Sequence, residues 1–367
     1  METYKKKYRF LFAGGGTGGH LFPAIAVAEK IMTLLPESEI LFVGTKSKIE
    51  GRVVPKLGFK FSPIWIKGFS RKLTFENLLF PLKLIVSVIQ SIFINIKFKP
   101  DVAIGTGGYV AGPAIYGSSL IGAKIILIEQ NSFPGITTKL LSKYADEIHI
   151  SFEDSLKYFP GNQKVFVTGN PVRENLKESS KEDALKEFKL SNNKKTLLIL
   201  GGSLGAGSLN EAVAASIKIL EGNEIQIIWQ TGNYYLEKYK NLSSGNIIIL
   251  PFIDRMNIAY SACDLMVARA GATTIAELLA LGIPSILVPS PNVAENHQFF
   301  NAKSLSDKNA AILIEDNMIK NKLSEEVIST INNLSKLNNL RQNALLLSKP
   351  NATAEIAQHA IKFARNN

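Results

Sequence analysis

The stretch GGGTGGHLFP (residues 14–23) combines a nearly side-chain-free turn with a histidine. It follows the apolar run FLFA and precedes a helical pattern, so the turn is expected to join a strand to a helix, with His20 in the first helical turn. Glycine-rich turns let the backbone approach a ligand closely, and a helix N-terminus carries about half a positive charge. His20 adds a group that can accept or donate a proton. A first-turn histidine satisfied by backbone groups is the simpler alternative.

The spacing Gly14-x-Gly16-x-x-Gly19 also matches the dinucleotide-binding fingerprint, which would indicate an NAD(P) enzyme. That fingerprint calls for an acidic residue after the second strand to hold the ribose. Here the second strand ends FVGTKSK, without a carboxylate, although its lysines would suit a 2′-phosphate. The NAD(P) hypothesis therefore remains as an alternative.

A second glycine loop, GGSLGAG (residues 201–207), places Ser203 and several backbone amides at the start of another helix. A pyrophosphate is well accommodated at such a position. A tight strand–helix turn without a ligand is the alternative.

Three further segments bring polar side chains to strand or helix ends. In ARAGATTIAELLALGIP (268–284), Glu277 either completes a capping box with Thr274 or accepts hydrogen bonds from two ribose hydroxyls. In GNPVR (169–173), Arg173 is either a salt-bridge partner or a phosphate clamp. In PSPNVAENHQ (289–298), Gln298 either caps a helix or reads sugar hydroxyls, because an amide donates and accepts at once.

Metal-dependent catalysis is not expected from the residue pattern. There is no Asp-x-Asp pair, the four histidines lack i, i+4 spacing, and Cys263 is the single cysteine. No Gly-x-Ser-x-Gly elbow or Walker loop occurs either. We therefore expect neither a bound metal nor another cofactor.

Alternating strand and helix patterns must position these residues. Strand-like apolar runs occur in the first half at 8–13, 39–44, 101–107, 124–130, 147–152 and 164–170. After a charged segment (177–195) the pattern restarts with TLLILGG, IQIIWQTG, NIIILPFI, LMVARAG and PSILVPS. Continuous apolar runs are typical of parallel strands buried on both faces. Two doubly wound α/β domains follow, whose ligands bind beyond the carboxyl ends of the strands, by default in the cleft between the domains.

The net charge of +11 is concentrated in the first half, where residues 1–165 hold 21 Lys/Arg against 12 Asp/Glu. This favours an anionic substrate or lipid surface. Nucleic acid is not expected, since no zinc-finger spacing or aromatic-rich basic cluster accompanies the charge. The single cysteine excludes an internal disulfide and suits a reducing compartment.

A signal peptide is not expected, because the apolar run FLFA is too short for one. A membrane-spanning helix at 78–98 is also rejected, because Lys83 and Lys97 leave only 13 uncharged residues between them. On a helical wheel, residues 83, 87, 90, 91, 95 and 97 form a polar arc. We expect the opposite, apolar face to pack on the domain's own sheet. Lipid contacts are expected instead at residues 66–80, where apolar and cationic side chains are mixed: Phe69, Phe75, Leu78 and Leu79 with Lys67, Arg71 and Lys72.

Seven ordered motifs together resemble one known family. GGTGGHLFPA, GTGGYVAGP (105–113), EQN (129–131), GNPVR, GGSLGA, RAGATTIAE and HQFFNA (297–302) are similar to those of the MurG family, undecaprenyldiphospho-muramoylpentapeptide β-N-acetylglucosaminyltransferases. The resemblance spans residues 8–302 and, more weakly, the tail. It implies a GT-B fold, with two Rossmann-like doubly wound parallel-sheet domains facing across a cleft. Residues 1–165 would bind the acceptor lipid I and the membrane, 166–350 would bind UDP-GlcNAc, and helix 351–367 would cross back to the first domain.

The resemblance also implies roles for individual residues. His20 would be the general base, or an orienting hydrogen-bond donor. Arg173 and Ser203 would hold the diphosphate, the backbone of Ile253 would pair with uracil, and Gln298 would read sugar hydroxyls. The remaining donor contacts would be made by Thr17, Gly18, Gly19 and Asn131 at the sugar or phosphates, and by Ala272, Thr273, Thr274, Ile275, Ala276 and Glu277 at the phosphate and ribose.

This sequence departs from the family pattern at Leu204, Ala268 and His297, where many members have Gln, Ser and Gln. The first two departures put side-chain contacts in doubt but leave backbone contacts to phosphate possible.

The family reaction moves N-acetylglucosamine from UDP to the C4 hydroxyl of lipid I with inversion, without a metal. It implies peripheral attachment to the cytoplasmic face of the plasma membrane, with cell-wall and division proteins as possible partners. The alternatives are another UDP-sugar transferase acting on a lipid such as diacylglycerol, the NAD(P) oxidoreductase, and a nucleotide-sugar-binding regulator without turnover.

Overall fold

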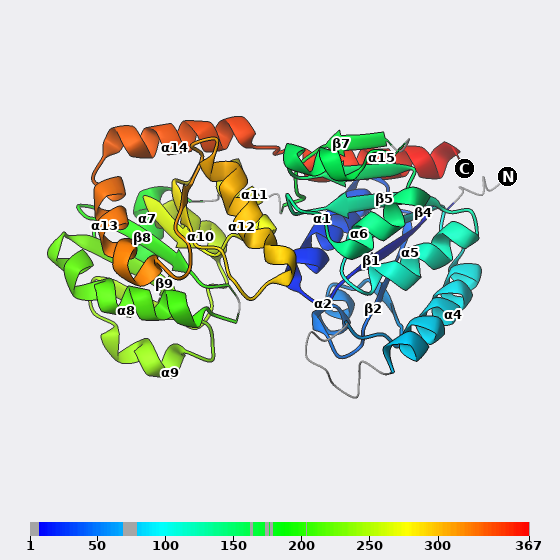
Figure 1. Ribbon diagram of the computed structural model, residues 1–367, viewed down its shortest axis with the longest axis horizontal. Helices are drawn as coiled ribbons and strands as arrows, with labels where there is room; N and C mark the ends of the chain where they lie inside the picture. Colours follow the sequence, from blue (N-terminus) through cyan, green and yellow to red (C-terminus); the bar gives the residue numbers. More distant parts are fainter. Residues whose placement is uncertain are drawn as a thin grey trace. The chain divides into compact units, whose positions relative to one another are not determined.

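The computed structural model describes residues 7–68, 79–161, 164–172, 176, 179–202 and 204–366 of the chain. The chain divides into two compact units (Figure 1). Unit 1 comprises Met1–Val172 and Lys349–Asn367, and unit 2 comprises Arg173–Ser348. The first unit thus extends past residue 165, the boundary expected from the sequence. The reason is that residue 165 lies inside a strand, β7 (Lys164–Val167), which pairs with β6 (Glu147–Ile150).

Unit 1 is built on a parallel sheet of seven described strands in the order β3-β2-β1-β4-β5-β6-β7. The remaining strands are β1 (Arg9–Gly14), β2 (Glu39–Gly44), β3 (Lys60–Pro63), β4 (Val102–Gly107) and β5 (Lys124–Glu129). The α-helices among the described residues are α1 (Gly18–Leu34), α2 (Ile49–Lys56), α4 (Phe80–Phe98), α5 (Ala111–Leu120), α6 (Ile136–Leu141) and α15 (Ala352–Asn366), and two 3₁₀ turns cover Ser142–Tyr144 and Glu153–Tyr158.

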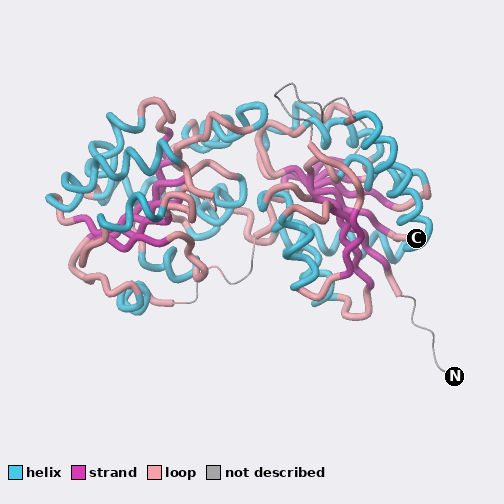
Figure 2. The backbone as a smooth tube through the Cα atoms, turned by 90° about the horizontal axis from the view of Figure 1, so that it is seen from below, coloured by secondary structure: helices cyan, strands magenta, loops and turns pink. Residues whose placement is uncertain are grey.

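Alternate residues of the central strands enter two separate apolar cores, as the period of a strand requires. Phe10 and Phe12 of β1 face a cluster made with α1, α2 and α15, whereas Leu11 and Ala13 face a cluster made with α5 and α6. The sheet is therefore covered on both faces, which explains its nearly continuous apolar strands. Figure 2 shows the strands of each unit lying among helices.

Helix α15, the last of the chain, belongs to unit 1. Its apolar side contributes Ile356, Ala357 and Ala360 to the core that α1 also lines. Thr353 adds a hydrogen bond from its hydroxyl to the carbonyl of Val172, at 3.0 Å. The final helix thus completes one face of the first sheet.

Unit 2 repeats the architecture with a parallel sheet of six described strands in the order β10-β9-β8-β11-β12-β13. The strands are β8 (Lys195–Leu200), β9 (Ile225–Gln230), β10 (Ile247–Leu250), β11 (Leu265–Ala268), β12 (Ser285–Leu287) and β13 (Ile312–Leu313). The α-helices are α7 (Lys181–Glu187), α8 (Gly207–Gly222), α9 (Leu236–Tyr239), α10 (Met256–Ala262), α11 (Ala272–Leu281), α12 (His297–Ser306), α13 (Ile319–Ile331) and α14 (Leu334–Leu347), with 3₁₀ turns at Lys240–Leu242 and Ala294–Asn296.

The two-domain, doubly wound α/β fold expected from the sequence is confirmed. Each sheet has a glycine turn between its first strand and the helix that follows. In unit 1, Gly16 adopts φ +85°, a conformation that favours glycine. In unit 2, Gly202 and Gly205 adopt φ +84° and +79°. Both turns lie at the carboxyl ends of their strands, the edge at which α/β sheets bind ligands.

The expectation that the apolar face of α4 packs on the sheet is wrong. The buried residues of this helix are Ser87, Ser91 and Asn95, from the polar arc. Asn95 donates to the carbonyl of Ala114 in α5 (3.3 Å) and accepts from the Ser118 hydroxyl (2.7 Å). These hydrogen bonds satisfy the buried polar groups, so the polar edge is the face that packs against α5. The exposed face consequently carries Leu82, Leu84, Ile85, Ile89, Phe93 and Ile96.

Replacing Asn95 with alanine tests this packing. The substitution removes the buried contacts with α5, so we expect the free energy of unfolding to fall by about 1–3 kcal/mol. Urea denaturation followed by circular dichroism measures the change. The control is Ile96→Ala on the exposed side of the same helix, which should change stability by less than about 0.5 kcal/mol. Equal unfolding midpoints for the two variants would contradict the inward orientation of Asn95.

Candidate active site

His20 lies in the first turn of α1, and hydrogen bonds hold one side of its ring. Nδ1 is 2.9 Å from the carbonyl oxygen of Thr106 and 3.3 Å from Oε1 of Gln130. Both partners are acceptors, so Nδ1 carries the hydrogen and Nε2 of the neutral ring is left as an acceptor. Gln130 is itself fixed, because its amide nitrogen donates to the carbonyls of Thr106 (2.9 Å) and Ile128 (3.1 Å). This arrangement presents Nε2 as a proton acceptor on a half-buried side chain.

A buried carboxylate holds the glycine turn that precedes His20. Glu50, at the start of α2, is 1% exposed and accepts the backbone N–H groups of Gly16 and Thr45, each at 3.0 Å. A side chain at Gly15 or Gly44 would collide with the Glu50 side chain, so both positions need glycine. Glu50 thereby ties the turn after β1 to the loop after β2. Sequence reasoning missed this residue, because a glutamate near a helix start looks like an ordinary first-turn acid.

Tyr109 packs against the same turn. Its ring would contact a Cβ atom at Gly16. Burial raises the pKa of the Tyr109 hydroxyl; Thr45 opposes this rise, and the charge of Glu50 adds to it. The hydroxyl thus stays protonated.

The other predicted residues of unit 1 lie in the first turn of α1 or in a loop at the same edge of the sheet. Thr17 is the exposed N-cap of α1, and Gly18 and Gly19 open its first turn. Asn131 follows β5, where Glu129 accepts hydrogen bonds from its backbone N–H (3.0 Å) and its side-chain amide (3.2 Å). Another buried carboxylate therefore orients Asn131.

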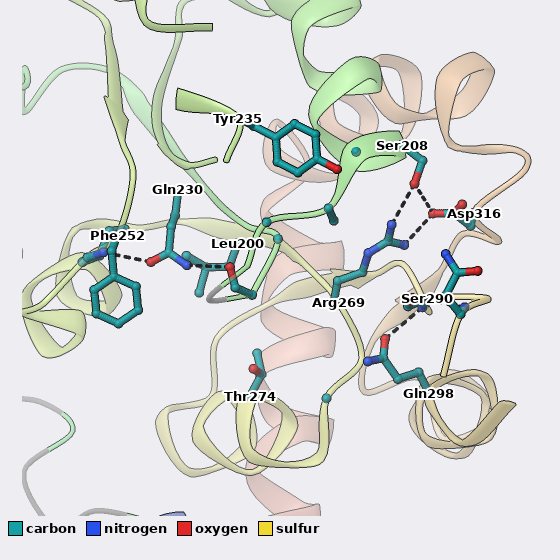
Figure 3. Close-up of a pocket in the computed structure, with 18 of the residues that line it drawn as sticks. Leu200, Ser208, Gln230, Tyr235, Phe252, Arg269, Thr274, Ser290, Gln298 and Asp316 are labelled. Atoms are coloured by element: carbon teal, nitrogen blue, oxygen red, sulfur yellow. Dashed lines mark hydrogen bonds and ion pairs between the residues drawn. The ribbon is translucent and has the colours of Figure 1, made fainter. Parts of the chain in front are cut away.

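Unit 2 contains a cavity of about 750 Å³ at the carboxyl ends of its strands (Figure 3). The glycine loop after β8, the start of α8 and the first two turns of α11 form its walls. The lining residues include Gly201, Gly202, Gly205, Ala206, Gly207, Ser208, Gln230, Tyr235, Phe252, Ile253, Tyr260, Arg269, Gly271, Thr274, Glu277, Ser290, Gln298 and Asp316. Two helix N-termini at one cavity provide backbone amides and partial positive charge for an anionic group.

Glu277 lies in this cavity wall and does not cap a helix. The N-cap of α11 is Gly271, so Thr274 and Glu277 are inside the helix, and the capping-box alternative is wrong. Oε2 of Glu277 accepts a hydrogen bond from the Tyr260 hydroxyl at 2.6 Å. A carboxylate offers about four acceptor sites, so it can accept from more than one hydroxyl group.

Only part of the predicted segment 272–277 reaches the cavity. Thr274 and Glu277 line it, whereas Ala272, Thr273, Ile275 and Ala276 are not among the lining residues. Ile275 is 1% exposed. Contacts from Ala272 and Thr273 to a ligand would therefore come from backbone amides in the first turn of α11, whereas the amide of Ile275 already donates to the carbonyl of Gly271 at 2.9 Å.

Gln298 and Ile253 also line the cavity, each with one polar group already paired. Oε1 of Gln298 accepts from the backbone N–H of Ser290 at 2.8 Å, which directs its amide NH₂ group, a double donor, away from that bond (Figure 3). The backbone N–H of Ile253 donates to Oε1 of Gln230 at 2.8 Å. A base recognised by this N–H would have to displace Gln230.

Arg269 is a cavity residue that sequence reasoning did not single out. Its guanidinium forms an ion pair with Asp316 and donates to Ser208 Oγ at 2.8 Å. The Ser208 hydroxyl donates in turn to Asp316 at 2.7 Å. The carboxylate offsets the charge of Arg269, so among the described cavity residues the helix termini are the main source of positive potential. The position of Arg269 at the end of β11, inside RAGATTIAE, was the available signal.

Two predicted diphosphate-binding residues, Arg173 and Ser203, lie outside the described residues. The same holds for most of the predicted lipid-contact segment, namely Phe69, Arg71, Lys72, Phe75 and Leu78.

Glu50 can be tested by its effect on stability. Glu50→Ala leaves two buried backbone donors without their acceptor, so we expect the free energy of unfolding to fall by about 2–4 kcal/mol. Thermal or urea unfolding measures it. The control is Glu39→Ala in β2, whose exposed pair with Lys60 should contribute about 1 kcal/mol or less. A Glu50→Ala protein as stable as Glu39→Ala would show that the carboxylate does not hold the turn.

Comparison with known proteins places the chain in a family. The glycosyltransferase family 28 N-terminal domain matches residues 10–150, and the family 28 C-terminal domain matches residues 196–359. A curated relative from Flavobacterium psychrophilum is 44% identical over 361 residues, covering 98% of each chain. A second, from Cytophaga hutchinsonii, is 42% identical, also covering 98% of each. Both are named UDP-N-acetylglucosamine--N-acetylmuramyl-(pentapeptide) pyrophosphoryl-undecaprenol N-acetylglucosamine transferase.

Comparison with solved structures agrees with these sequence matches. The crystal structure of Acinetobacter baumannii MurG aligns with a TM-score of 0.78 and 29% identity, covering 97% of this chain and 100% of that one. A UDP-glucose: anthocyanidin 3-O-glucosyltransferase in complex with UDP shares the fold at 12% identity, with a TM-score of 0.69, covering 99% of this chain and 100% of that one. The chain therefore belongs to glycosyltransferase family 28 and, within it, to the MurG family.

Proposed function

We propose that the protein transfers N-acetylglucosamine from UDP-N-acetylglucosamine to the C4 hydroxyl of undecaprenyl-diphospho-N-acetylmuramoyl-pentapeptide, lipid I, with inversion. The relatives' printed names support both substrates. The observation that carries the proposal within the structure is the unit 2 cavity, which combines two helix N-termini with Glu277 and Gln298. Amides suit a diphosphate, and the carboxylate and amide side chains suit hydroxyls of ribose and sugar.

The donor occupies the unit 2 cavity in this proposal. The diphosphate lies at the starts of α8 and α11, where the described residues offer backbone amides, and Arg173 and Ser203 are assigned to the same group. Glu277 accepts from the ribose hydroxyls, with Tyr260 holding its carboxylate in place. Gln298 donates its amide hydrogens to the sugar. Ile253 and its neighbour Phe252, which is 46% exposed, contact the uracil.

His20 acts as the general base. Nε2 removes the proton of the acceptor hydroxyl while that oxygen attacks the anomeric carbon of N-acetylglucosamine. The bond from this carbon to the diphosphate breaks, and UDP leaves with the electron pair. The hydrogen bond from Nδ1 to Thr106 keeps Nε2 available and stabilises the imidazolium that forms. Thr17, Gly18, Gly19 and Asn131 contact the donor sugar or its phosphates.

Two variants separate the proposed roles of His20 and Glu277. His20→Ala removes the base, so turnover should fall about 10²-fold or more. The unit 2 cavity is unchanged in this variant, so UDP-N-acetylglucosamine binding should be retained. Glu277→Ala removes the ribose acceptor and should weaken UDP-N-acetylglucosamine binding about tenfold or more, as expected when about 1.5–3 kcal/mol of charged hydrogen bonding is lost.

The measurements are UDP release and disaccharide formation with a soluble lipid I analogue, and calorimetric titration with UDP-N-acetylglucosamine. A diacylglycerol acceptor included in parallel distinguishes the related lipid glycosyltransferase. The assignment of the base fails if His20→Ala turns over like the unchanged protein. The proposed reaction fails if UDP is released without a muramoyl product.

We further propose that α4 attaches the protein to the cytoplasmic face of the membrane. By length and composition α4 could span a membrane, but its polar edge is hydrogen-bonded to α5 of the same unit. This favours a helix lying on the lipid surface with its apolar face inward. Trp65, half exposed beneath Lys83, and the terminal Lys97 and Lys99 add an aromatic and cationic rim suited to anionic lipid.

Phe93→Glu tests the membrane surface. Phe93 is 68% exposed in the free protein, and burying a phenylalanine in lipid contributes about 1.5–3 kcal/mol, so binding to anionic vesicles should weaken about tenfold or more. Vesicle sedimentation at low salt measures this binding. The matched control is Leu346→Glu on α14 of unit 2, another exposed apolar residue, which should bind like the unchanged protein. Equal binding by both variants would exclude the α4 face.

A further inference from the structure

Unit 1 contains a buried cluster of two histidines and a glutamate that the proposed reaction does not use. Glu147 and His149 are alternate residues of β6, so their side chains share one face of the sheet. His359 reaches them from α15, at a separation of 212 residues from Glu147 in the sequence. One potential ligand atom from each of the three side chains lies within 4.8 Å of the other two.

His149 is the unusual member of this cluster. It is fully buried, and neither ring nitrogen has a hydrogen-bond partner within 3.5 Å among the described residues. Its Nε2 lies 3.6 Å from Oε2 of Glu147, too far for a hydrogen bond. Phe166 stacks on the ring at a centroid distance of 5.4 Å. Buried polar groups are almost always satisfied, so a nitrogen directed at a carboxylate without bonding to it calls for a further partner.

The separations between these atoms suit a shared cation. Zinc binds imidazole nitrogen and carboxylate oxygen at about 2.0–2.2 Å, which places ligand atoms of a tetrahedral site about 3.3 Å apart. The separation from Glu147 Oε2 to His359 Nδ1 is 2.7 Å, a hydrogen bond in this structure, and the separation to His149 Nε2 is 3.6 Å, so the two lie on either side of that value. His359 is 28% exposed at its side chain, which leaves an approach for a metal ion and a water ligand.

The charges around the cluster also suit a metal. The Glu147 carboxylate faces both imidazole rings. Glu355, one helical turn before His359, adds negative charge close enough to act on His149. Two carboxylates would balance a divalent ion.

We propose that Glu147, His149 and His359 form a binding site for a divalent transition metal, zinc in the first instance, that fastens α15 to β6. The site is structural, because it joins the last helix of the chain to a strand of the first sheet. Metal binding of this kind adds its free energy to folding. The proposal is independent of the transfer reaction.

The test uses the untagged full-length protein, stripped with EDTA and dialysed. Incubation with zinc chloride, removal of free metal and elemental analysis should give one zinc per chain. The thermal unfolding temperature should rise with zinc and return to its starting value with EDTA. Cobalt(II) in place of zinc should give the visible absorption bands of a tetrahedral nitrogen and oxygen site.

His359→Ala should weaken zinc binding at least about tenfold, since even loss of an outer-shell partner costs that much. This residue is partly exposed, so the variant is expected to fold, which circular dichroism checks. Glu147→Gln, which keeps the shape but removes the charge, should have the same effect. The matched control is His297→Ala in α12 of unit 2, which should bind zinc like the unchanged protein. Failure of the unchanged protein to retain zinc, or equal retention by His359→Ala and His297→Ala, would overturn the proposal.

Discussion

Backbone N–H groups at the carboxyl edge of the unit 1 sheet need acceptors, and buried carboxylates provide them. Glu50 accepts from Gly16 and Thr45, while Glu129 accepts from Asn131 and Gly135. The loops after β1, β2 and β5 are thereby held without their own regular structure. Because the first of these loops leads directly into α1, the position of His20 depends on a glutamate that acts on it through the backbone of the turn.

In unit 2 a neutral amide side chain holds the corresponding backbone groups, and two charged cavity side chains are paired with each other. Gln230 spans the end of β9, accepting from Ile253 and donating to the carbonyl of Gly202, and so fixes both the glycine loop and the opposite wall of the cavity. The charge of Arg269 is balanced by Asp316. Among its described residues, such a site has its positive potential at helix N-termini. This suits the diphosphate of the proposed donor, which is a diester when it binds and carries additional negative charge when it leaves as UDP.

Helix α4 shows how a polar edge can decide the orientation of an apolar helix. Packing of Ser91 and Asn95 against α5 allows close approach at Gly117, where a side chain would meet the α4 backbone. The apolar residues are left outside because the small polar side chains give the tighter contact. In water this leaves several large apolar side chains of one helix face exposed, and contiguous apolar surfaces mark binding sites for membranes or partners.

The sequence by itself determined the strand–helix alternation, the two glycine turns and the family, because apolar runs, glycine spacing and ordered motifs are local signals. The sequence did not predict the edge strands β3 and β13, because both strands are short and only partly buried. It pointed to His20 and Glu277 by residue type and position, but it left open the capping box at Glu277 and gave the wrong buried face for α4. Only the tertiary structure decided these points, and it alone revealed Glu50, Arg269 and the cluster of Glu147, His149 and His359. The physical reason is that each depends on contacts between residues far apart in the chain, where burial and hydrogen-bond partners are set by packing rather than by neighbouring residues.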